Sequence, residues 1–421
     1  MLLVVALGVA RGAEVPLGLL GDWGGLRTYL ADHGVDLELS YINESAVNVR
    51  GGDSREAAYA DQFYFGGWLN LKQLVGVPGA RIVFSLSDRN GESLTVKAGL
   101  HNLLEVQEIY GLGNYARLNQ LYGEQRLFDD RLLLKFGRLT GTFDVMPFSC
   151  YFQNIAFCAT LPSHNVAANW IPFPGSTWAG VARLDFKNDW YVQGGVYEVN
   201  PDFYEPKYRF AFGTPFGGPG KREVLEVGWL PKSAGVDGGY RIGAWYDNVG
   251  GDDLFLNTEG APLATAGGTP LQQHHQSGFY AMAQQQVWTH PGSERRRISL
   301  FANFVQADRR IAEIEQIAEV GFFWTGPTSL RPQDDFSGAV ARVHVNSLIA
   351  EGATLYNSQS PPPPGPPKPV PYNEWSSEIH YSVNVTPAIT VRPNVQFIHA
   401  PGGVDERTSV VVLGLHLSVQ F

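Results

Sequence analysis

Arginine, carboxylate and tryptophan side chains recur at alternate positions along this chain, on faces that are otherwise polar. Guanidinium and carboxylate groups hydrogen-bond the hydroxyls of a solute, and aromatic side chains suit its apolar ring faces. Mixed charges along a passage orient dipolar solutes without strongly preferring one ion. The pattern therefore predicts non-covalent contacts with hydroxyl-rich molecules. The candidate contact residues are Trp68, Arg81, Arg89, Glu108, Arg117, Arg183, Asp185, Arg241, Trp245, Asp247, Glu378 and Arg392.

Plainer explanations for these residues stay open at the level of sequence. Most of the arginines could simply neutralise carboxylates on the same wall, so that few of them line the narrowest point. Arg89 lies in the motif SDRNG and could instead belong to a turn. Glu108 has an ambiguous side, since both Glu105 and Glu108 could face water.

The elements that must position these side chains are strands, because apolar and polar residues alternate along most of the chain. The final segment shows the pattern most clearly, although Val410 and Val412 interrupt its polar face. About sixteen or seventeen segments repeat it, each near the ~10 residues that a tilted strand needs to cross a bilayer. Even strand numbers in bacterial single-chain barrels favour sixteen. The apolar face of the final segment contains Ser409, Val411, Leu413, Leu415, Leu417, Val419 and Phe421.

The composition agrees with an all-β transmembrane antiparallel barrel. The chain has 48 Gly and 27 Pro, and only 17% of its residues are charged, which suits many strands joined by turns. Its mean hydropathy is −0.12, and no apolar run reaches the ~18 residues of a helical span. The net charge of −10 argues against a nucleic-acid partner. Tryptophans at strand ends fit interfacial girdles, although each alone could belong to an ordinary sheet edge: Trp178, Trp190, Trp229, Trp288, Trp324 and Trp375.

Three parts of the chain are expected. Residues 1–13 read as the remnant of a signal peptide, with an apolar stretch and a small-x-small cleavage site but no basic start. Residues 14–34 contain a short helical segment, and residues 35–421 form the barrel. Long extracellular loops should include the proline-rich stretch 361–371, which cannot join a strand ladder.

The chain has two cysteines, Cys150 and Cys158, with seven residues between them. In an oxidising compartment they would form a small loop disulfide, and two buried free thiols are the alternative. A metal site would need further ligands, and no other Cys or His lies beside them at ligand spacing. The sequence thus implies no metal and no cofactor. Gln153 and Asn154 would suit a loop folded inward to narrow a pore.

Rival classes of protein can be weighed against the barrel. An enzyme is disfavoured, because the chain shows no nucleophile elbow, zinc-binding helix or phosphate loop. A secreted soluble β protein that binds sugars would bury its alternating apolar faces against one another. A general or anion-preferring porin stays open, because arginines alone do not set selectivity.

Seven motifs make the chain resemble the OprB-type carbohydrate-selective porins of bacterial outer membranes, nearly end to end. The resemblance implies a sixteen-stranded barrel that passes monosaccharides such as glucose by facilitated diffusion, without a cofactor. We also expect contact with outer-membrane lipid, recognition by barrel-assembly machinery through the strand ending at Phe421, and a homotrimer as one option. The proline-rich loop and the absent basic start depart from the family. The motifs are GDWGGLR (21–27), SDRNG (87–91), VQEIYG (106–111), KFGRL (135–139), SCYFQNIAFC (149–158), TGPTSLRPQDD (325–335) and VTPAITVRPNVQFIHAPGG (385–403).

Overall fold

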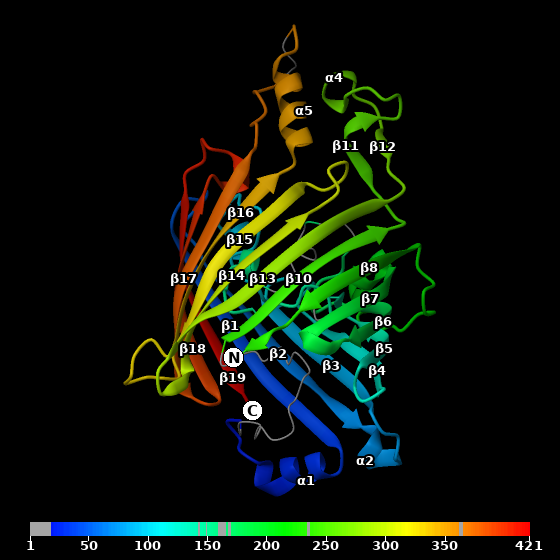
Figure 1. Ribbon diagram of the computed structural model, residues 1–421. Coiled ribbons are helices and arrows are strands. Elements are labelled where there is room, and N and C mark those ends of the chain that lie inside the picture. Colours follow the sequence, from blue (N-terminus) through cyan, green and yellow to red (C-terminus); the bar gives the residue numbers. More distant parts are fainter. Residues whose placement is uncertain are drawn as a thin grey trace.

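The computed structural model describes residues 18–141, 144–148, 150–158, 166, 170–233, 236–361 and 365–421, so the expected signal segment 1–13 lies outside it. The described chain forms a closed antiparallel barrel of sixteen strands, which confirms the predicted fold class (Figure 1). The barrel strands are β1 (Val35–Arg50), β2 (Ala57–Asn70), β3 (Ala80–Gly91), β4 (Ala116–Leu127), β5 (Leu132–Leu139), β6 (Thr177–Asp185), β7 (Trp190–Val199), β8 (Gly220–Trp229), β10 (Val236–Asp247), β13 (Gln276–His290), β14 (Ser293–Gln306), β15 (Ile314–Thr325), β16 (Asp335–Val345), β17 (Asn373–Thr386), β18 (Ile389–His399) and β19 (Val410–Gln420).

Short strands and helices lie in the connections at the two ends of the barrel. The short strand β9 (Lys232–Ser233) pairs with the start of β10, and β11 (Asp252–Asn257) pairs with β12 (Pro270–Gln272) in a separate hairpin. None of the described helices combines the length and apolar character that crossing a membrane requires. The helices are α1 (Leu26–Asp32), α2 (Leu71–Val75), α3 (Leu94–Lys97), α4 (Leu263–Ala266) and α5 (Ser347–Asn357), with 3-10 turns η1 (Trp23–Gly25), η3 (Ile155–Phe157), η5 (Lys187–Asp189), η6 (Pro201–Tyr204), η7 (Pro206–Tyr208) and η8 (Pro401–Gly403).

The connections differ in length between the two ends. Helices α1 and α2 and the C-terminus lie at one end, whereas α5 and the β11–β12 hairpin project from the other (Figure 1). The connection that carries α5 and the proline-rich stretch therefore lies opposite Phe421. Short turns at the Phe421 end and long loops at the other are the arrangement of outer-membrane barrels, with the long loops outside the cell.

The first and last strands close the ring. Strand β1 pairs with both β2 and β19, and its register with β19 includes Asn43 opposite Leu417 and Val47 opposite Leu413. The short segment before α1 adds to this seam, because Leu19 donates its backbone N–H to the Gln420 carbonyl over 2.7 Å. Closure satisfies backbone groups that would otherwise face hydrocarbon.

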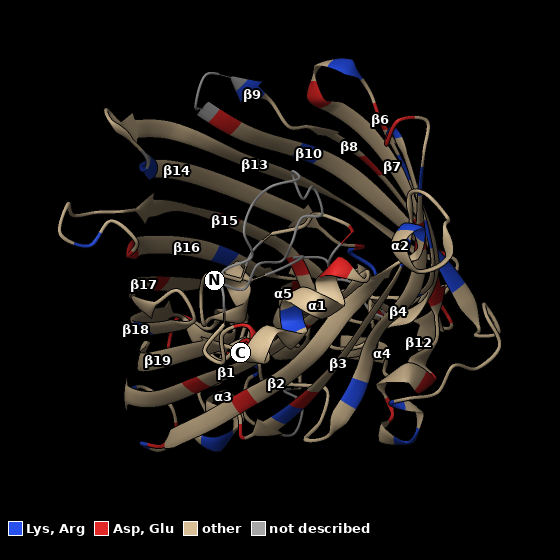
Figure 2. Cartoon of the chain, turned by 90° about the horizontal axis from the view of Figure 1, so that it is seen from below, with Lys and Arg blue, Asp and Glu red and all other residues tan. Residues whose placement is uncertain are grey.

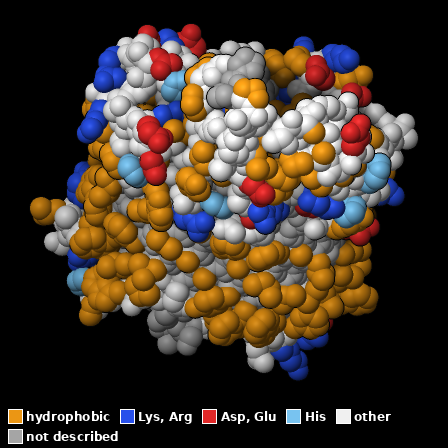
Figure 3. All heavy atoms as spheres, turned by 90° about the horizontal axis from the view of Figure 1, so that it is seen from above, with side chains coloured by type: hydrophobic (Ala, Val, Ile, Leu, Met, Phe, Trp, Pro, Cys, Tyr) orange, Lys and Arg blue, Asp and Glu red, His pale blue; other side chains and the backbone are white. Residues whose placement is uncertain are grey.

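The two faces of the strands follow the predicted alternation. On β19 the outward Leu413 and Leu415 are 43% and 44% exposed, while the next residue, His416, is buried on the inner face. Charged residues occur on both the strands and the loops when the barrel is seen from below (Figure 2), and hydrophobic side chains cover much of the surface in Figure 3. The irregular Val410 and Val412 are fully buried on the inner face, where they pack with residues of the β3–β4 connection, including Leu94 and Val106.

Aromatic side chains gather at the Phe421 end of the wall. Trp190 begins β7, Trp229 ends β8 and Tyr240 lies near the start of β10. The rings of Trp190 and Trp229 stack with centroids 5.7 Å apart, and Trp229 stacks on Tyr240 at 5.4 Å. Two exposed tryptophans beside a half-buried tyrosine in this position match one of the expected interfacial girdles.

Candidate functional site

Two long connections fold into the barrel and narrow its interior. The first joins β3 to β4 (residues 92–115), and the second joins β5 to β6, where the structure describes residues 140–141, 144–148, 150–158, 166 and 170–176. Gln153 of the second loop accepts a hydrogen bond from Asn394 on the inner face of β18 over 2.7 Å. Gln107 of the first donates to the Glu44 backbone carbonyl over 2.8 Å. We therefore call the described residues 92–115 and 140–141, 144–148 and 150–158 the constriction loops.

Three buried carboxylates on the inner wall hold these loops by their backbone. Glu378 of β17 accepts from the backbone N–H groups of Gln153 and Asn154 at 3.0 and 2.7 Å. Glu44 of β1 accepts from the Ile109 N–H at 3.3 Å. Glu374 of β17 accepts from the Leu103 N–H at 2.8 Å and from a second loop near η8. These hydrogen bonds tie the backbone of both loops to the inner wall of the barrel.

A hydrophobic cluster completes the attachment of the second constriction loop. Phe152 and Phe157 are almost fully buried and lie 5.2 Å apart between ring centroids. Phe148 packs on Phe301 of β14 at 4.8 Å, and Tyr151 packs on Phe323 of β15 at the same distance. The described part of the loop thus contacts β14 and β15, and it also reaches the opposite wall, where the Met146 N–H bonds Glu226 of β8 at 2.8 Å. The loop therefore narrows the open path through the barrel.

Arg89, which is 6% exposed, and Glu108, which is half-buried, carry opposite charges close to one another inside the barrel. Arg89 of β3 donates from Nε to Gln62 Oε1 over 2.8 Å, and its guanidinium lies 5.3 Å from the Phe173 ring centroid. Within the described chain, its two terminal nitrogens have no recorded hydrogen bond to protein. Burial raises the pKa of Glu108 above its ordinary value, and the charges of Arg89 and Arg392 partly offset that rise. A donor cation and an acceptor carboxylate thus lie at one point in the passage.

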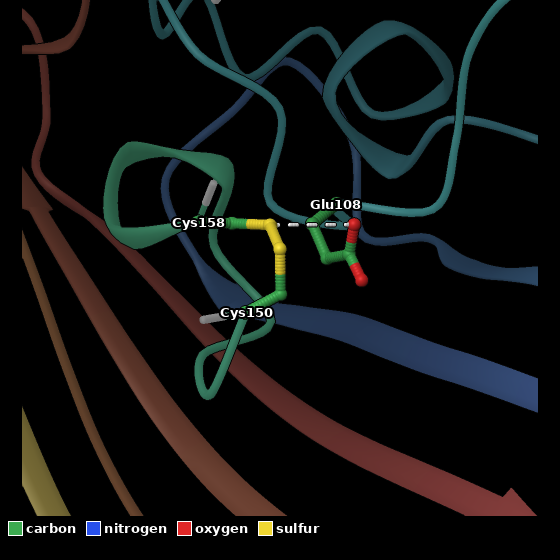
Figure 4. Close-up of side chains that lie close together, drawn as sticks. All are labelled: Glu108, Cys150 and Cys158. Atoms are coloured by element: carbon green, nitrogen blue, oxygen red, sulfur yellow. Dashed lines mark hydrogen bonds between the residues drawn. A yellow bond between two sulfur atoms is a disulfide. The ribbon is translucent and has the colours of Figure 1, made fainter. Parts of the chain in front are cut away.

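The disulfide braces this point from the second loop. The structure joins Cys150 to Cys158, and Cys158 Sγ lies 3.6 Å from Glu108 Oε2 (Figure 4). The Asn154 side chain caps the short turn η3 between the cysteines by accepting from the Ala156 N–H at 2.9 Å. The inward loop that Gln153 and Asn154 suggested is therefore present, and the disulfide packs directly against a candidate contact residue.

Of the other candidates, Arg392 and Glu378 lie near this constriction. Arg392 donates from Nε to Ser382 and from a terminal nitrogen to the Tyr151 carbonyl at 2.7 Å. Glu378 and Arg392 are buried, as Arg89 is, but unlike Arg89 they bond the second constriction loop directly and so help to hold it.

A second group lies on the inner wall towards the Phe421 end. Arg81 pairs with Glu124 at 2.7 Å, and Arg183 pairs with Asp185 at the same distance. Arg241 donates to the Tyr191 hydroxyl over 3.0 Å. These charges are mostly neutralised by neighbours, as the plainer reading of the arginines anticipated. Trp68, also on the inner face, lies two residues before the end of β2 at this side of the barrel.

The remaining candidates serve the structure of the long loops. Arg117 is 3% exposed and donates to carbonyls of η6, including Tyr204 at 3.1 Å. Asp247 accepts from Arg222 Nε over 2.6 Å and is fully buried. Trp245 packs edge-on against Trp170 with centroids 5.8 Å apart. Neither Arg117 nor Asp247 presents a polar group to the open path.

Sequence reasoning missed Glu44 and Gln62, which position the central pair. Glu44 continues the inward parity of Asp36 and Glu38 on β1, so the alternation contained a signal for it. Gln62 likewise lies on the inward side of β2 beside Trp68. Nothing local marks either residue as a partner of Arg89 or of the first constriction loop, since those contacts join separate strands and loops.

Comparison with known proteins shows which family this chain resembles in sequence and in fold. The sequence model of the carbohydrate-selective porin OprB family matches residues 54–421. Porin B of Pseudomonas aeruginosa is 35% identical over 420 residues, which cover 96% of this chain and 91% of that protein. The putative porin QuiX of Acinetobacter baylyi is 28% identical, with 96% and 93% covered. The high-pH structure of Pseudomonas putida OprB has a TM-score of 0.92 and 36% identity, with 96% and 98% covered.

Proposed function

The chain belongs to the OprB family of carbohydrate-selective porins, and on that premise we propose that Arg89 and Glu108 form the sugar contact of its pore. The protein is a sugar-selective porin of the bacterial outer membrane, a channel rather than an enzyme. The solute that we propose is a monosaccharide such as glucose. Arg89 would donate to its hydroxyls, and Glu108 would accept from them.

One observation supports this assignment more than any other. Arg89 is held by Gln62 through Nε alone, so its terminal N–H groups are left for a solute, whereas Arg117 spends its terminal nitrogens on loop carbonyls. The aromatic Phe173 beside the guanidinium adds an apolar surface that a sugar ring could use. A rigid donor and acceptor thus replace part of the water around the sugar.

Passage also requires that the sugar leave again. A single contact point with a few hydrogen bonds gives weak binding, and weak or repeated sites allow conduction. We propose that the inner-wall pairs Arg81–Glu124 and Arg183–Asp185 form later contacts on the way to the Phe421 end. Movement through these sites follows the concentration gradient, and no bond is made or broken.

Single-channel conductance in a planar bilayer tests the proposal. We expect discrete openings that glucose blocks in a saturable way, while sucrose, at twice the size, blocks weakly or not at all. A channel whose current ignores glucose would remove the sugar contact, and equal block by both sugars would remove the preference for monosaccharides. A general or anion-preferring porin would give a current that glucose does not change.

The pH dependence of the block gives a more specific prediction. Because burial raises the pKa of Glu108, its carboxylate should lose its charge at a higher pH than an ordinary glutamate as the solution is acidified. The protonated group is a poorer acceptor, so glucose should bind more weakly in acid. The dissociation constant from conductance block, measured against pH, should lose this dependence in Glu108→Gln. An unchanged pH profile in that variant would assign the effect to another group.

The outer surface of the barrel and its last strand suggest which partners the protein contacts in the membrane. We propose that the outward aliphatic face contacts lipid, and that assembly machinery recognises the strand ending at Phe421, whose backbone N–H bonds the Leu39 carbonyl at 2.9 Å. A homotrimer remains a hypothesis, and native mass spectrometry in detergent would decide it: a dominant monomer at all concentrations would reject it.

A further inference from the structure

Two sulfur atoms and one carboxylate converge in the constriction. A carboxylate oxygen of Glu108 and the sulfurs of Cys150 and Cys158 all lie within 4.8 Å of one another (Figure 4). They come from the two constriction loops, which are held together here by the Glu108 N–H bond to the Gln153 carbonyl at 2.8 Å. The cluster therefore needs no large movement to surround one small ion.

The chemistry of the cluster depends on its oxidation state. As a disulfide, the sulfurs carry no charge and are weak ligands. As thiolates beside a carboxylate, they provide the sulfur and oxygen donors that zinc-like cations bind, with one position left for water. We propose that the reduced Cys150–Cys158 pair and Glu108 form a latent site for a soft divalent cation, and that the bound ion closes the pore.

Neighbouring charges both favour and oppose this ion. The carboxyl group of Glu44 lies close enough to Glu108 for the two to interact, whereas Arg89 and Arg392 act on Glu108 as positive charges. Two thiolates and the Glu108 carboxylate together carry three negative charges, which exceed the two positive charges of the cation. The two nearby arginines repel the cation and should weaken its binding, but they should not prevent it. A metal ion on Glu108 would also remove the acceptor that faces Arg89. This inference rests on the proposed position of the sugar contact.

Reduction needs a reagent that can enter the constriction. Dithiothreitol is a four-carbon dithiol built on a sugar-alcohol skeleton, so it is smaller than the expected solute. Its two S–H groups supply the hydrogens for Cys150 and Cys158, the protein S–S bond breaks, and the reagent closes into a cyclic disulfide. Binding of the metal then releases the two thiol protons.

The test compares cadmium block before and after reduction in the same bilayer. Cadmium ions should leave the untreated channel open, and after dithiothreitol is applied and washed out they should abolish most of the current. A chelator should restore it. Glu108→Gln keeps the cysteines and should lose the block, whereas Glu105→Gln should keep it, because Glu105 bonds Ser93 at 2.7 Å and is not part of the cluster.

Two further measurements make each outcome decisive. A thiol titration must count two new thiols, and reduced protein in detergent should gain a cadmium–thiolate absorption band that Cys158→Ser lacks. Equal block of the untreated channel, or two thiols with neither block nor band, would overturn the proposal. Glucose block of the untreated channel, recorded first, tests the sugar contact separately, so the two proposals can fail independently.

Discussion

Replacing Glu378 with alanine is expected to widen the pore and to raise its conductance several-fold. The carboxylate is 2% exposed and accepts the N–H groups of Gln153 and Asn154 at 3.0 and 2.7 Å. Each such bond to an ionised group contributes about 1.5–3 kcal/mol. Its removal leaves two buried donors without their acceptor, so the second constriction loop should leave the wall. Single-channel conductance and glucose block should change together.

The matched control is Glu319→Gln on β15. Glu319 is as deeply buried as Glu378, but its recorded hydrogen bond goes to the Asn303 side chain and not to a constriction loop. This variant should conduct like the parent. For both variants, gel electrophoresis of unheated and heated protein checks assembly, because a folded barrel and an unfolded chain migrate differently. If assembled Glu378→Ala retains the parental conductance, the carboxylate does not anchor the loop.

Arg89→Gln should weaken glucose binding roughly 10- to 100-fold, the loss expected for hydrogen bonds from a charged group. Glutamine removes the charge and the terminal donors but retains a polar group towards Gln62. Because Arg89 lies on the inner face of β3, barrel assembly should be unaffected. Glucose titration of the single-channel current measures the dissociation constant directly.

Arg183→Gln provides the comparison for Arg89. Arg183 also faces inward, but it is paired with Asp185 at 2.7 Å and stacks on the Tyr191 ring at 3.8 Å. Its loss should change glucose affinity by less than about threefold, since an exposed pair contributes little. Equal losses in the two variants would mean that sugar is held along the whole wall, and an unaffected Arg89→Gln would place the contact elsewhere.

The barrel was predictable from the sequence because its signal is local and repeated. A strand with one face in lipid must alternate, and the alternation around Arg241 and His416 assigned their inward side directly. The count of sixteen followed from closure and from the even strand number of such barrels. Sugar selectivity came from resemblance to a family, and the comparisons confirm it.

The constriction was less predictable because its contacts are distant in sequence. Asn154 and Glu378 are separated by 224 residues, and nothing local to either one specifies the other. Val410 and Val412 broke the polar face of the last strand, and only the packed β3–β4 connection explains why. Glu108 had an ambiguous parity because it lies in a loop, where alternation carries no information.

The seam between β1 and β19 has a consequence for how the chain reaches its native state. Its paired residues, such as Asn43 and Leu417, belong to the two most distant strands, so the last contacts to form carry the largest loop-closure entropy. Until then both edges are unpaired, which hydrocarbon does not tolerate. Insertion strand by strand is therefore unfavourable. The chain must either close before it enters the bilayer or have both edges occupied by a temporary partner.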